Sequence, residues 1–391
     1  MSHVHDVFCT ILPPHILKHM ATVGDKEICD NAYRSMEAAA AARGQRATIG
    51  PMAALLSVSP GEKRRTVFDA KNAQQLPGKL VRGESDKAGK DVTVNEAFDG
   101  AGATYDFYRT VYGRNSVDGN GMRLDSTVHY GRNFDNAFWN GMQMVYGDGD
   151  GRIFNRFTLC IDVIGHELTH GVVQFSGGLV YQDQSGALNE HFADVFGSLV
   201  KQYQKKQTAD KADWLIGEGL LAKGIKGIAL RSLKSPGTAY NDPMLGRDPQ
   251  PSHMRNLLRT DDDNGGVHIN SGIPNKAFQT LAATLGGFAW EKAGRIWYQT
   301  LTRGLTPNAT FQQCAEATFE AAGTLFGAGK AEQLAVRQAW QAVGLDVVKG
   351  QVVVAGPKLT VKDAASAPAP SAPAAAAVAA KPKARAKRST R

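Results

Sequence analysis

His166-Glu167-Leu168-Thr169-His170 is the stretch that decides the fold and the chemistry of this 391-residue chain. Apolar residues recur at helical spacing from Phe157 onward, so the stretch is predicted to lie in a helix. Histidines at positions i and i+4 lie on one face of a helix, one turn apart. Both imidazoles can therefore reach one metal ion. The apolar residues that set the period are Leu159, Val163, Ile164 and Leu168.

A third ligand has to come from elsewhere, because a hydrolytic zinc site uses three protein ligands and leaves a position for water. Glu190 is the candidate, since it follows His170 by twenty residues in a second segment of helical period. The predicted ligands of one catalytic zinc are therefore His166, His170 and Glu190. Asp194, one turn after Glu190, shares its face and is placed to accept the distal N–H of a ligand histidine.

The composition is that of a soluble globular protein with room for two packed domains, at 42% hydrophobic and 21% charged residues. Apolar stretches end well short of the roughly 18 residues that span a bilayer, so no membrane segment is expected. The first residues lack a basic region followed by an apolar run, so a Sec signal peptide is not readable. We expect secretion by a signal-peptide-independent route, with a cytoplasmic location as the alternative. The four scattered cysteines do not predict a disulfide framework.

The two ends of the chain differ in composition from its middle. Residues 1–50 form a small module with a predicted helix at 30–43, closed by the breakers Ile49-Gly50-Pro51. Residues 348–391 are predicted to be a disordered tail, because the Ala, Pro, Ser, Lys and Arg there cannot bury enough apolar surface. Six of the basic residues behind the net charge of +8 lie in this tail: Lys381, Lys383, Arg385, Lys387, Arg388 and Arg391.

The fold class predicted for the remainder is α+β, with two domains. Residues 51–180 alternate short β-prone runs with Gly, Asn and Asp turns and end in the H-E-x-x-H helix, which predicts a mostly antiparallel β domain. Gln143–Tyr146 is one expected strand. Residues 181–347, rich in Ala, Leu and Phe toward their end, predict a helical domain. The zinc site is expected between the two.

Residues 65–346 resemble the thermolysin family of neutral metallopeptidases, and within it the protealysin-like branch with a short propeptide. Asn136-Ala137-Phe138-Trp139-Asn140-Gly141 resembles the edge strand of that family, in which Asn136 and Ala137 would hold the extended substrate. Tyr181 and His268 match its transition-state stabilisers.

The resemblance extends to residues that assist these groups. Asp263 matches the carboxylate that orients the catalytic histidine, and Arg231 matches the arginine that binds the substrate carbonyl beside the cut bond. An apolar pocket for the residue after that bond is implied as well, so the resemblance implies a preference for large hydrophobic residues at P1'. The residues that match this pocket are Phe154, Phe157, Val163, Ile216 and Leu230.

The activity implied is that of a zinc endopeptidase acting on peptides and proteins, expected to be a monomer. Zinc lowers the pKa of its water from about 15.7 towards about 7, and Glu167 would take the proton as water attacks the peptide carbonyl. An inactive homologue that only binds is the alternative, but Glu167 is retained beside both histidines and Glu190. Nucleic-acid binding by the tail would be salt-sensitive, and the tail has no stacking aromatics to support it.

Ile11-Leu12-Pro13-Pro14-His15-Ile16-Leu17 resembles the Pro-Pro motif of the short propeptides, which implies an inactive precursor inhibited by its own propeptide. Cys9 or His15 could occupy the open zinc position. Packing across the cleft would inhibit the enzyme without such a ligand.

One position departs from the family pattern. Asp162, Asp213 and Glu218 match three calcium-binding carboxylates of thermolysin, but the glutamate shared between its ions is here Lys201. Calcium takes six to eight oxygen ligands, and an ammonium group offers none. We expect Lys201 to pair with these carboxylates in place of calcium, so that any calcium is bound in fewer ions than in thermolysin. The alternative is a solvated surface lysine.

Overall fold

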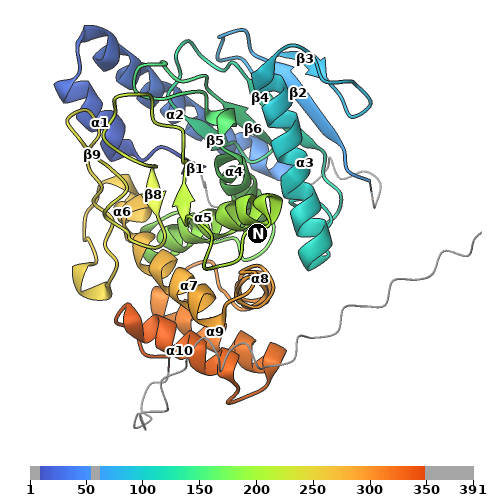
Figure 1. Cartoon of the computed structure of the whole chain (residues 1–391). Helices are drawn as coiled ribbons and strands as arrows, with labels where there is room; N and C mark the ends of the chain where they lie inside the picture. The colour runs from blue at the N-terminus through green and yellow to red at the C-terminus, as the bar shows by residue number, and fades with distance from the viewer. Residues whose placement is uncertain (1–8, 54–61, 348–391) are drawn as a thin grey trace, which may run out of the picture.

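A computed structural model describes the backbone of residues 9–53 and 62–347. A six-stranded sheet forms the N-terminal part and packed helices form the C-terminal part, as the sequence predicted, but the sheet is mixed rather than mostly antiparallel (Figure 1). The strand order is β1-β5-β6-β4-β2-β3. The strands are β1 (Cys9–Thr10), β2 (Arg65–Asp69), β3 (Lys79–Arg82), β4 (Leu124–Val128), β5 (Ala137–Trp139) and β6 (Gln143–Tyr146).

Strand pairing in this sheet is antiparallel at its two edges and parallel in its middle. Pairs β1/β5, β5/β6 and β2/β3 are antiparallel, whereas β2/β4 and β4/β6 are parallel. Short two-stranded ribbons follow farther along the chain. They are formed by β7 (Leu215–Ile216) with β8 (Arg231–Ser232), and by β9 (Asn241–Asp242) with β10 (Gly246–Arg247).

Helices α4 and α5 cross the centre of the molecule, and α3 lies along the sheet (Figure 1). Helix α3 begins where the Asp91 side chain accepts from the backbone N–H groups of Thr93 and Val94, an N-cap that satisfies two otherwise unpaired donors. The helices are α1 (Pro14–Val23), α2 (Lys26–Ala53), α3 (Val92–Tyr112), α4 (Ile161–Gln174), α5 (Asp183–Lys205), α6 (Asp263–Asn270), α7 (Gly272–Leu285), α8 (Ala293–Arg303), α9 (Phe311–Phe326) and α10 (Ala331–Ala342), with 3-10 turns η2 (Phe157–Leu159) and η3 (Met254–Asn256).

Two element boundaries differ from the sequence prediction. Helix α2 extends beyond the predicted 30–43 and runs through Gly50 and Pro51 to Ala53. Pro51 lies in the last turn of this helix, where its missing N–H removes only one backbone hydrogen bond. Residues 157–159, expected to begin the metal-binding helix, form the 3-10 turn η2 instead.

A continuous hydrophobic core joins the sheet to the helices. It includes Val128 of β4, Leu168 of α4, Leu199 of α5 and Trp340 of α10, each no more than 1% exposed. No helix in residues 9–53 and 62–347 is both long and apolar enough to cross a membrane. The predicted tail, 348–391, lies outside the described residues.

Two glycines let α4 and α5 approach to backbone contact. A Cβ added to Gly165 would lie 3.2 Å from the Cα of Gly197. A Cβ added to Gly197 would lie 2.5 Å from the carbonyl oxygen of Asp162 and 2.9 Å from the backbone nitrogen of His166. Both neighbours are backbone atoms, so the helices could accommodate a methyl group only by moving apart.

We therefore expect Gly197→Ala to destabilise the fold by overpacking, by roughly 1 to 3 kcal/mol, even though alanine favours helix. Denaturant unfolding of the full chain measures this. Gly89→Ala is the control, because a Cβ there meets nothing within 4 Å. Equal stabilities for the two variants would contradict a close helix crossing.

Candidate metal centre

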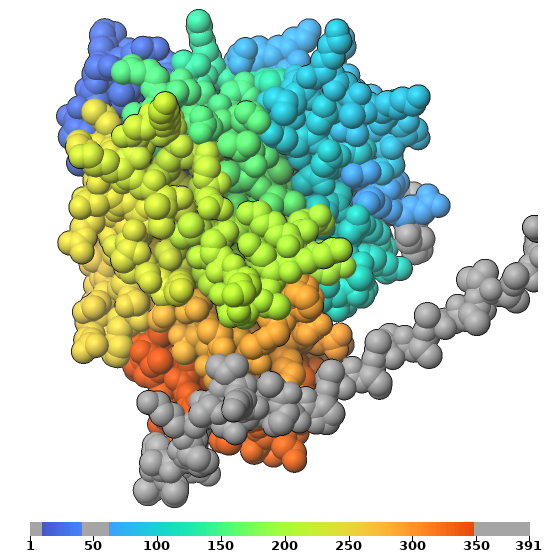
Figure 2. Space-filling model, in the orientation of Figure 1, coloured from blue at the N-terminus to red at the C-terminus, as the bar shows by residue number. Residues whose placement is uncertain are grey.

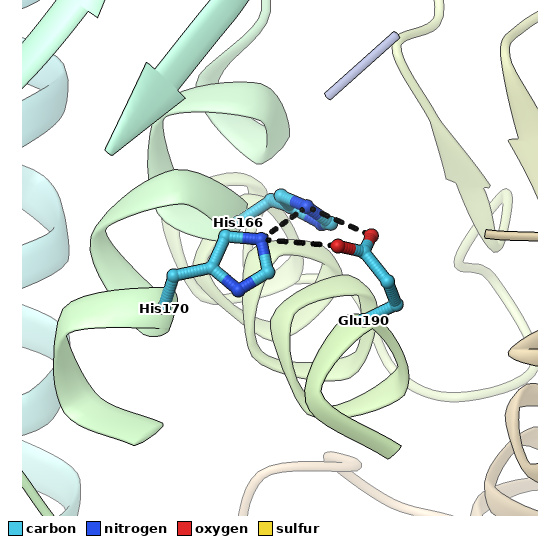
Figure 3. Close-up of side chains that lie close together, drawn as sticks. All are labelled: His166, His170 and Glu190. Atoms are coloured by element: carbon cyan, nitrogen blue, oxygen red, sulfur yellow. Dashed lines mark hydrogen bonds and ion pairs between the residues drawn. The ribbon is translucent and has the colours of Figure 1, made fainter. Parts of the chain in front are cut away.

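His166 and His170 on α4 face Glu190 on α5 (Figure 3). The two histidine Nε2 atoms are 3.0 Å apart, and each lies 3.5 Å from an oxygen of the Glu190 carboxylate. All three side chains are buried, and they form a group of potential metal ligands within the described residues. The structure thus brings the three predicted ligands to one point.

Hydrogen bonds on the far side of each imidazole determine which ring nitrogens face that point. His166 Nδ1 lies 2.9 Å from Asp194 Oδ1, and His170 Nδ1 lies 2.8 Å from Asn189 Oδ1. Each acceptor requires a proton on Nδ1, so each neutral ring presents an unprotonated Nε2. Two lone pairs 3.0 Å apart repel unless a cation lies between them.

The donor set fits zinc. Two imidazole nitrogens and one carboxylate, with a position left for water, make up the His₂Glu arrangement of catalytic zinc sites. Ligand atoms about 2.1 Å from a tetrahedral ion lie roughly 3.4 Å from one another, close to the separations here. Glu190 Oε2 is buried and accepts no hydrogen bond from the described residues, so it is available as a ligand.

Glu167 lies beside the cluster without belonging to it. Its Oε2 accepts from the backbone N–H of Trp139 on β5 at 2.9 Å, and its buried Oε1 has no hydrogen-bond partner among the described residues. Burial raises the pKa of this carboxyl well above its ordinary value, and the charge of Glu190 raises it further. A carboxylate held at one oxygen and open at the other can exchange a proton with a nearby group.

Asp194 is shared between the metal ligand His166 and Arg231. Arg231 donates from Nε at 2.9 Å to Oδ2 and from Nη2 at 2.8 Å to Oδ1. Burial alone would raise the pKa of Asp194, but Arg231 and His166 bring it well below its ordinary value. The carboxylate therefore stays ionised and anchors both side chains.

Tyr181 and His268 lie on the other side of Glu190. The Tyr181 hydroxyl donates to Glu190 Oε1 and lies 3.3 Å from His268 Nε2. Asp263 Oδ1 is 2.7 Å from His268 Nδ1. Burial lowers the pKa of His268, but the charges of Asp263 and Glu190 outweigh it and raise the value to about 9. His268 can therefore donate from Nε2 while Asp263 holds its other nitrogen.

The five residues matched to the substrate pocket are all buried in the main core. None is more than 1% exposed, and the rings of Phe154 and Phe157 lie 5.9 Å apart. Ile216 pairs with Arg231 across the β7/β8 ribbon, which connects the apolar set to the arginine. The set comprises Phe154, Phe157, Val163, Ile216 and Leu230.

The N-terminal segment lies across this site as an added edge strand. Strand β1 pairs antiparallel with β5, and the Ile11 N–H donates to the Ala137 carbonyl at 3.1 Å. The Leu12 N–H donates to Asn136 Oδ1 at 3.0 Å. At the same point His268 Nε2 lies 2.9 Å from the Thr10 carbonyl oxygen.

Two further contacts complete the position of this segment. Arg231 Nη1 donates to the Ile11 carbonyl at 2.9 Å. His15, considered as a zinc ligand, instead has its Nε2 2.9 Å from the Tyr240 hydroxyl. The blue N-terminal module occupies one corner of the molecule, next to the yellow and green segments (Figure 2). Its surface ion pairs include Lys18 with Asp262.

Lys201 is a buried cation rather than a solvated lysine, at 3% exposure. Its Nζ lies 2.9 Å from Asp162 Oδ2 and 2.7 Å from Asp213 Oδ1, and it donates to the Leu215 carbonyl at 2.7 Å. Burial lowers its pKa, but the charges of Asp162 and Asp213 raise it above the ordinary value. Three acceptors use all three donors of an ammonium group.

Glu218 does not pair with Lys201, contrary to the expectation from the sequence. It is half exposed and lies 3.8 Å from Lys205. The third donor of Lys201 goes to the Leu215 carbonyl instead, and Asp162 also accepts from the Gly217 N–H.

Sequence reasoning missed several groups at the site. Asn189, which holds His170, directly precedes Glu190, but no spacing rule indicates an amide at that position. The Trp139 N–H that binds Glu167 is a backbone group and leaves no signal in side-chain chemistry. His191 and Asn275, which hydrogen-bond to each other beside Asp194, also belong to no motif.

Two crossing helices that present two histidines and a glutamate around one point, with a second glutamate beside them, define a zinc-dependent hydrolase of the H-E-x-x-H class. Residues 58–174 match the family model for the thermolysin metallopeptidase catalytic domain, and residues 177–345 match that for its alpha-helical domain. The chain therefore belongs to the thermolysin family, and it is a zinc metalloendopeptidase.

Named relatives agree with this family. An extracellular metalloprotease of Pectobacterium carotovorum subsp. carotovorum is 50% identical over 350 residues, covering 87% of this chain and 97% of the relative. Thermolysin of Alicyclobacillus acidocaldarius subsp. acidocaldarius is 43% identical over 287 residues, covering 71% and 50%. The solved precursor of protealysin, a metalloproteinase from Serratia proteamaculans, matches with a TM-score of 0.79 and 50% identity, covering 86% of this chain and 99% of that one.

We expect Lys201→Ala to cost up to roughly 3 kcal/mol, because it leaves Asp162 and Asp213 without their buried cation. Lys205→Ala is the matched control, since an exposed pair contributes under about 1 kcal/mol. Lys201→Glu restores an oxygen ligand, so its melting temperature should rise with millimolar calcium more than that of the wild type. Melting curves with calcium and with EDTA measure this. Equal calcium responses would show that Lys201 does not replace an ion.

Proposed function

We propose that this enzyme cleaves peptide bonds on the amino side of large hydrophobic residues, with Glu167 as the general base, and that its N-terminal segment inhibits it before maturation. The observation that carries the proposal is the segment on β5, whose carbonyl groups meet His268 and Arg231 as those of an extended substrate would.

Zinc bound by His166, His170 and Glu190 would supply a water of lowered pKa and polarise the substrate carbonyl. Glu167 would accept the proton of that water at Oε1, the oxygen without a hydrogen-bond partner among the described residues, and return it to the leaving amine. Its other oxygen stays on the Trp139 N–H, which keeps the carboxylate in position.

Tyr181 and His268 would donate to the oxyanion that develops on the attacked carbonyl. The contact of His268 Nε2 with the Thr10 carbonyl, at 2.9 Å, is a ground-state version of this interaction. Donors already oriented where charge develops stabilise the transition state without reorganisation. Asp263 would keep the ring of His268 in the donating orientation.

Ile11 supports the proposed specificity. If the Thr10 carbonyl takes the place of the attacked group, Ile11 is the residue after the cut bond, and Arg231 binds its carbonyl. Ile11 is wholly buried in the same hydrophobic cluster as the five pocket residues. An apolar enclosure of this kind favours residues such as Leu, Ile or Phe through the area they bury.

Maturation would remove the N-terminal segment, about residues 1–50, and free the edge strand for substrates. Asn136 and Ala137 would then bind the backbone of an extended peptide. A relative is named as an extracellular metalloprotease, which supports secretion of this enzyme.

We expect Glu167→Gln to retain zinc and fold but lose cleavage by at least a hundredfold, because the water would lack its base. Metal analysis of the purified chain and cleavage of a peptide with Leu after the scissile bond measure the two properties. Glu190→Gln is the paired variant and should lose the zinc itself. Substantial turnover by Glu167→Gln would remove Glu167 from the role of base.

We expect Ile11→Glu to raise the activity of the uncleaved precursor by roughly tenfold or more, because an unpaired charge in the apolar enclosure would weaken the segment's binding. A short fluorogenic peptide, assayed before N-terminal processing, reports the change. Tyr33→Glu, at an exposed position of the same module, should leave the precursor inhibited. An Ile11→Glu precursor as inactive as wild type would contradict inhibition by this segment.

A further inference from the structure

His191 directly follows the metal ligand Glu190, yet its ring is no part of the ligand group. Its Nδ1 lies 2.7 Å from Asn275 Oδ1 on α7, and its Nε2 lies 2.7 Å from Trp297 Nε1 on α8. Its ring is fully buried and both nitrogens are occupied, so the zinc chemistry described above leaves it without a role.

The donors and acceptors around His191 have only one consistent arrangement. An indole N–H can only donate, so Trp297 donates to an unprotonated Nε2 and the proton of the neutral ring is on Nδ1. Nδ1–H then donates to the side-chain oxygen of Asn275. The amide nitrogen of Asn275 is thereby directed away from His191, and it donates to Asp194 Oδ2 at 2.9 Å.

The far end of this chain of hydrogen bonds is the metal centre. Asp194 receives Asn275 on one oxygen and the Nδ1–H of His166 on the other, at 2.9 Å. Rotating the Asn275 amide by 180° would set donor against donor at His191 and oxygen against carboxylate at Asp194. Through His191 and Asn275, Trp297 therefore determines which group donates to Asp194 Oδ2. Asp194 in turn orients the ring of His166.

Trp297, which begins this series of hydrogen bonds, is held firmly by its aromatic neighbours. The Trp297 ring stacks on Trp340 with centroids 6.1 Å apart and planes 6° apart, and it meets Phe278 edge-on at 5.1 Å. Trp297 and His191 are each 0% exposed. Four wholly buried polar links with no water access leave few alternative arrangements, and such networks are costly to satisfy only in part.

We propose that His191 and Asn275 are positioning residues for the zinc ligand His166, acting through Asp194 from the Trp297 anchor. The inference rests on the proposed ligand set, and it adds to that set a hydrogen-bond chain that ties the core of the helical part to the metal. Partners that orient a metal-bound histidine influence metal affinity as well as activity. We therefore expect this series of hydrogen bonds to affect zinc affinity.

The test measures zinc affinity by competition with a chelator, using the full chain with Glu167→Gln so that self-cleavage does not interfere. His191→Phe should bind zinc roughly tenfold more weakly, and Trp297→Phe about threefold more weakly. His191→Asn should stay closer to wild type than His191→Phe, because its amide nitrogen can still donate to Asn275. Cobalt(II) in place of zinc should show altered visible bands in His191→Phe.

Trp340→Phe is the matched control. It removes a buried indole donor from the same stacked pair, but that donor is directed to Thr318 at 2.8 Å and not to His191. It should lower the melting temperature of the zinc-free protein while leaving zinc affinity within about twofold of wild type, as expected for a change that only affects packing.

Equal zinc affinities for Trp297→Phe and Trp340→Phe would overturn the proposal, even if His191→Phe fails to fold. Unchanged cobalt bands and zinc affinity in a folded His191→Phe protein would overturn it as well. A parent chain that binds no zinc at all would instead refute the ligand set, so the two failures are distinguishable.

Discussion

The buried carboxylate of Asp194 is the interaction on which the site depends. It accepts from His166, from two nitrogens of Arg231 and from Asn275, all without contact with water. A buried ion pair of this kind costs several kcal/mol when one partner is lost, so its groups are held together strongly. Because Arg231 also donates to the Ile11 carbonyl, the same carboxylate contacts His166 of the proposed ligand set and the arginine that binds the N-terminal segment.

The sequence predicted the site best where residue chemistry and helical spacing indicate the same residues. The i, i+4 histidines on one helical face predicted His166 and His170, and the need for a third ligand led to Glu190 on the next helix. How closely those helices approach was not predictable, because the cause is a tertiary contact between Gly165 and Gly197. An N-terminal sheet and a helical C-terminal part followed from hydrophobic periodicity and the resemblance. The parallel pairs β2/β4 and β4/β6 did not, because strand direction depends on connections that short β-prone runs do not reveal. The C-terminal end of α2 was not predicted, because Gly50 and Pro51 lie within its last turn and do not end it.

Lys201 shows a different limit. The sequence identified a cation where a calcium ligand was expected, and the structure has it buried between Asp162 and Asp213. Glu218 was assigned to the same cluster on the match alone. An ammonium group has three donors, and a backbone carbonyl, which no side-chain motif reveals, takes the third. At Lys201 this backbone acceptor is the reason that the set of partners carried over from the resemblance needs correction.

The N-terminal segment could inhibit the enzyme in two ways, and its contacts distinguish between them. One way would distort the site, but the three proposed ligands are already clustered, Glu167 is already held by the Trp139 N–H, and His268 is already paired with Asp263. The other is occupancy: a tethered strand competes at an effective concentration in the millimolar range without any ligand to the metal. The contacts of β1 with β5, His268 and Arg231 are of this second kind. If the segment inhibits by occupying the substrate position, maturation only has to remove it, and no catalytic side chain has to be rearranged afterward. The free-energy cost of releasing the segment is then the cost of breaking those hydrogen bonds and exposing the Ile11 side chain to water.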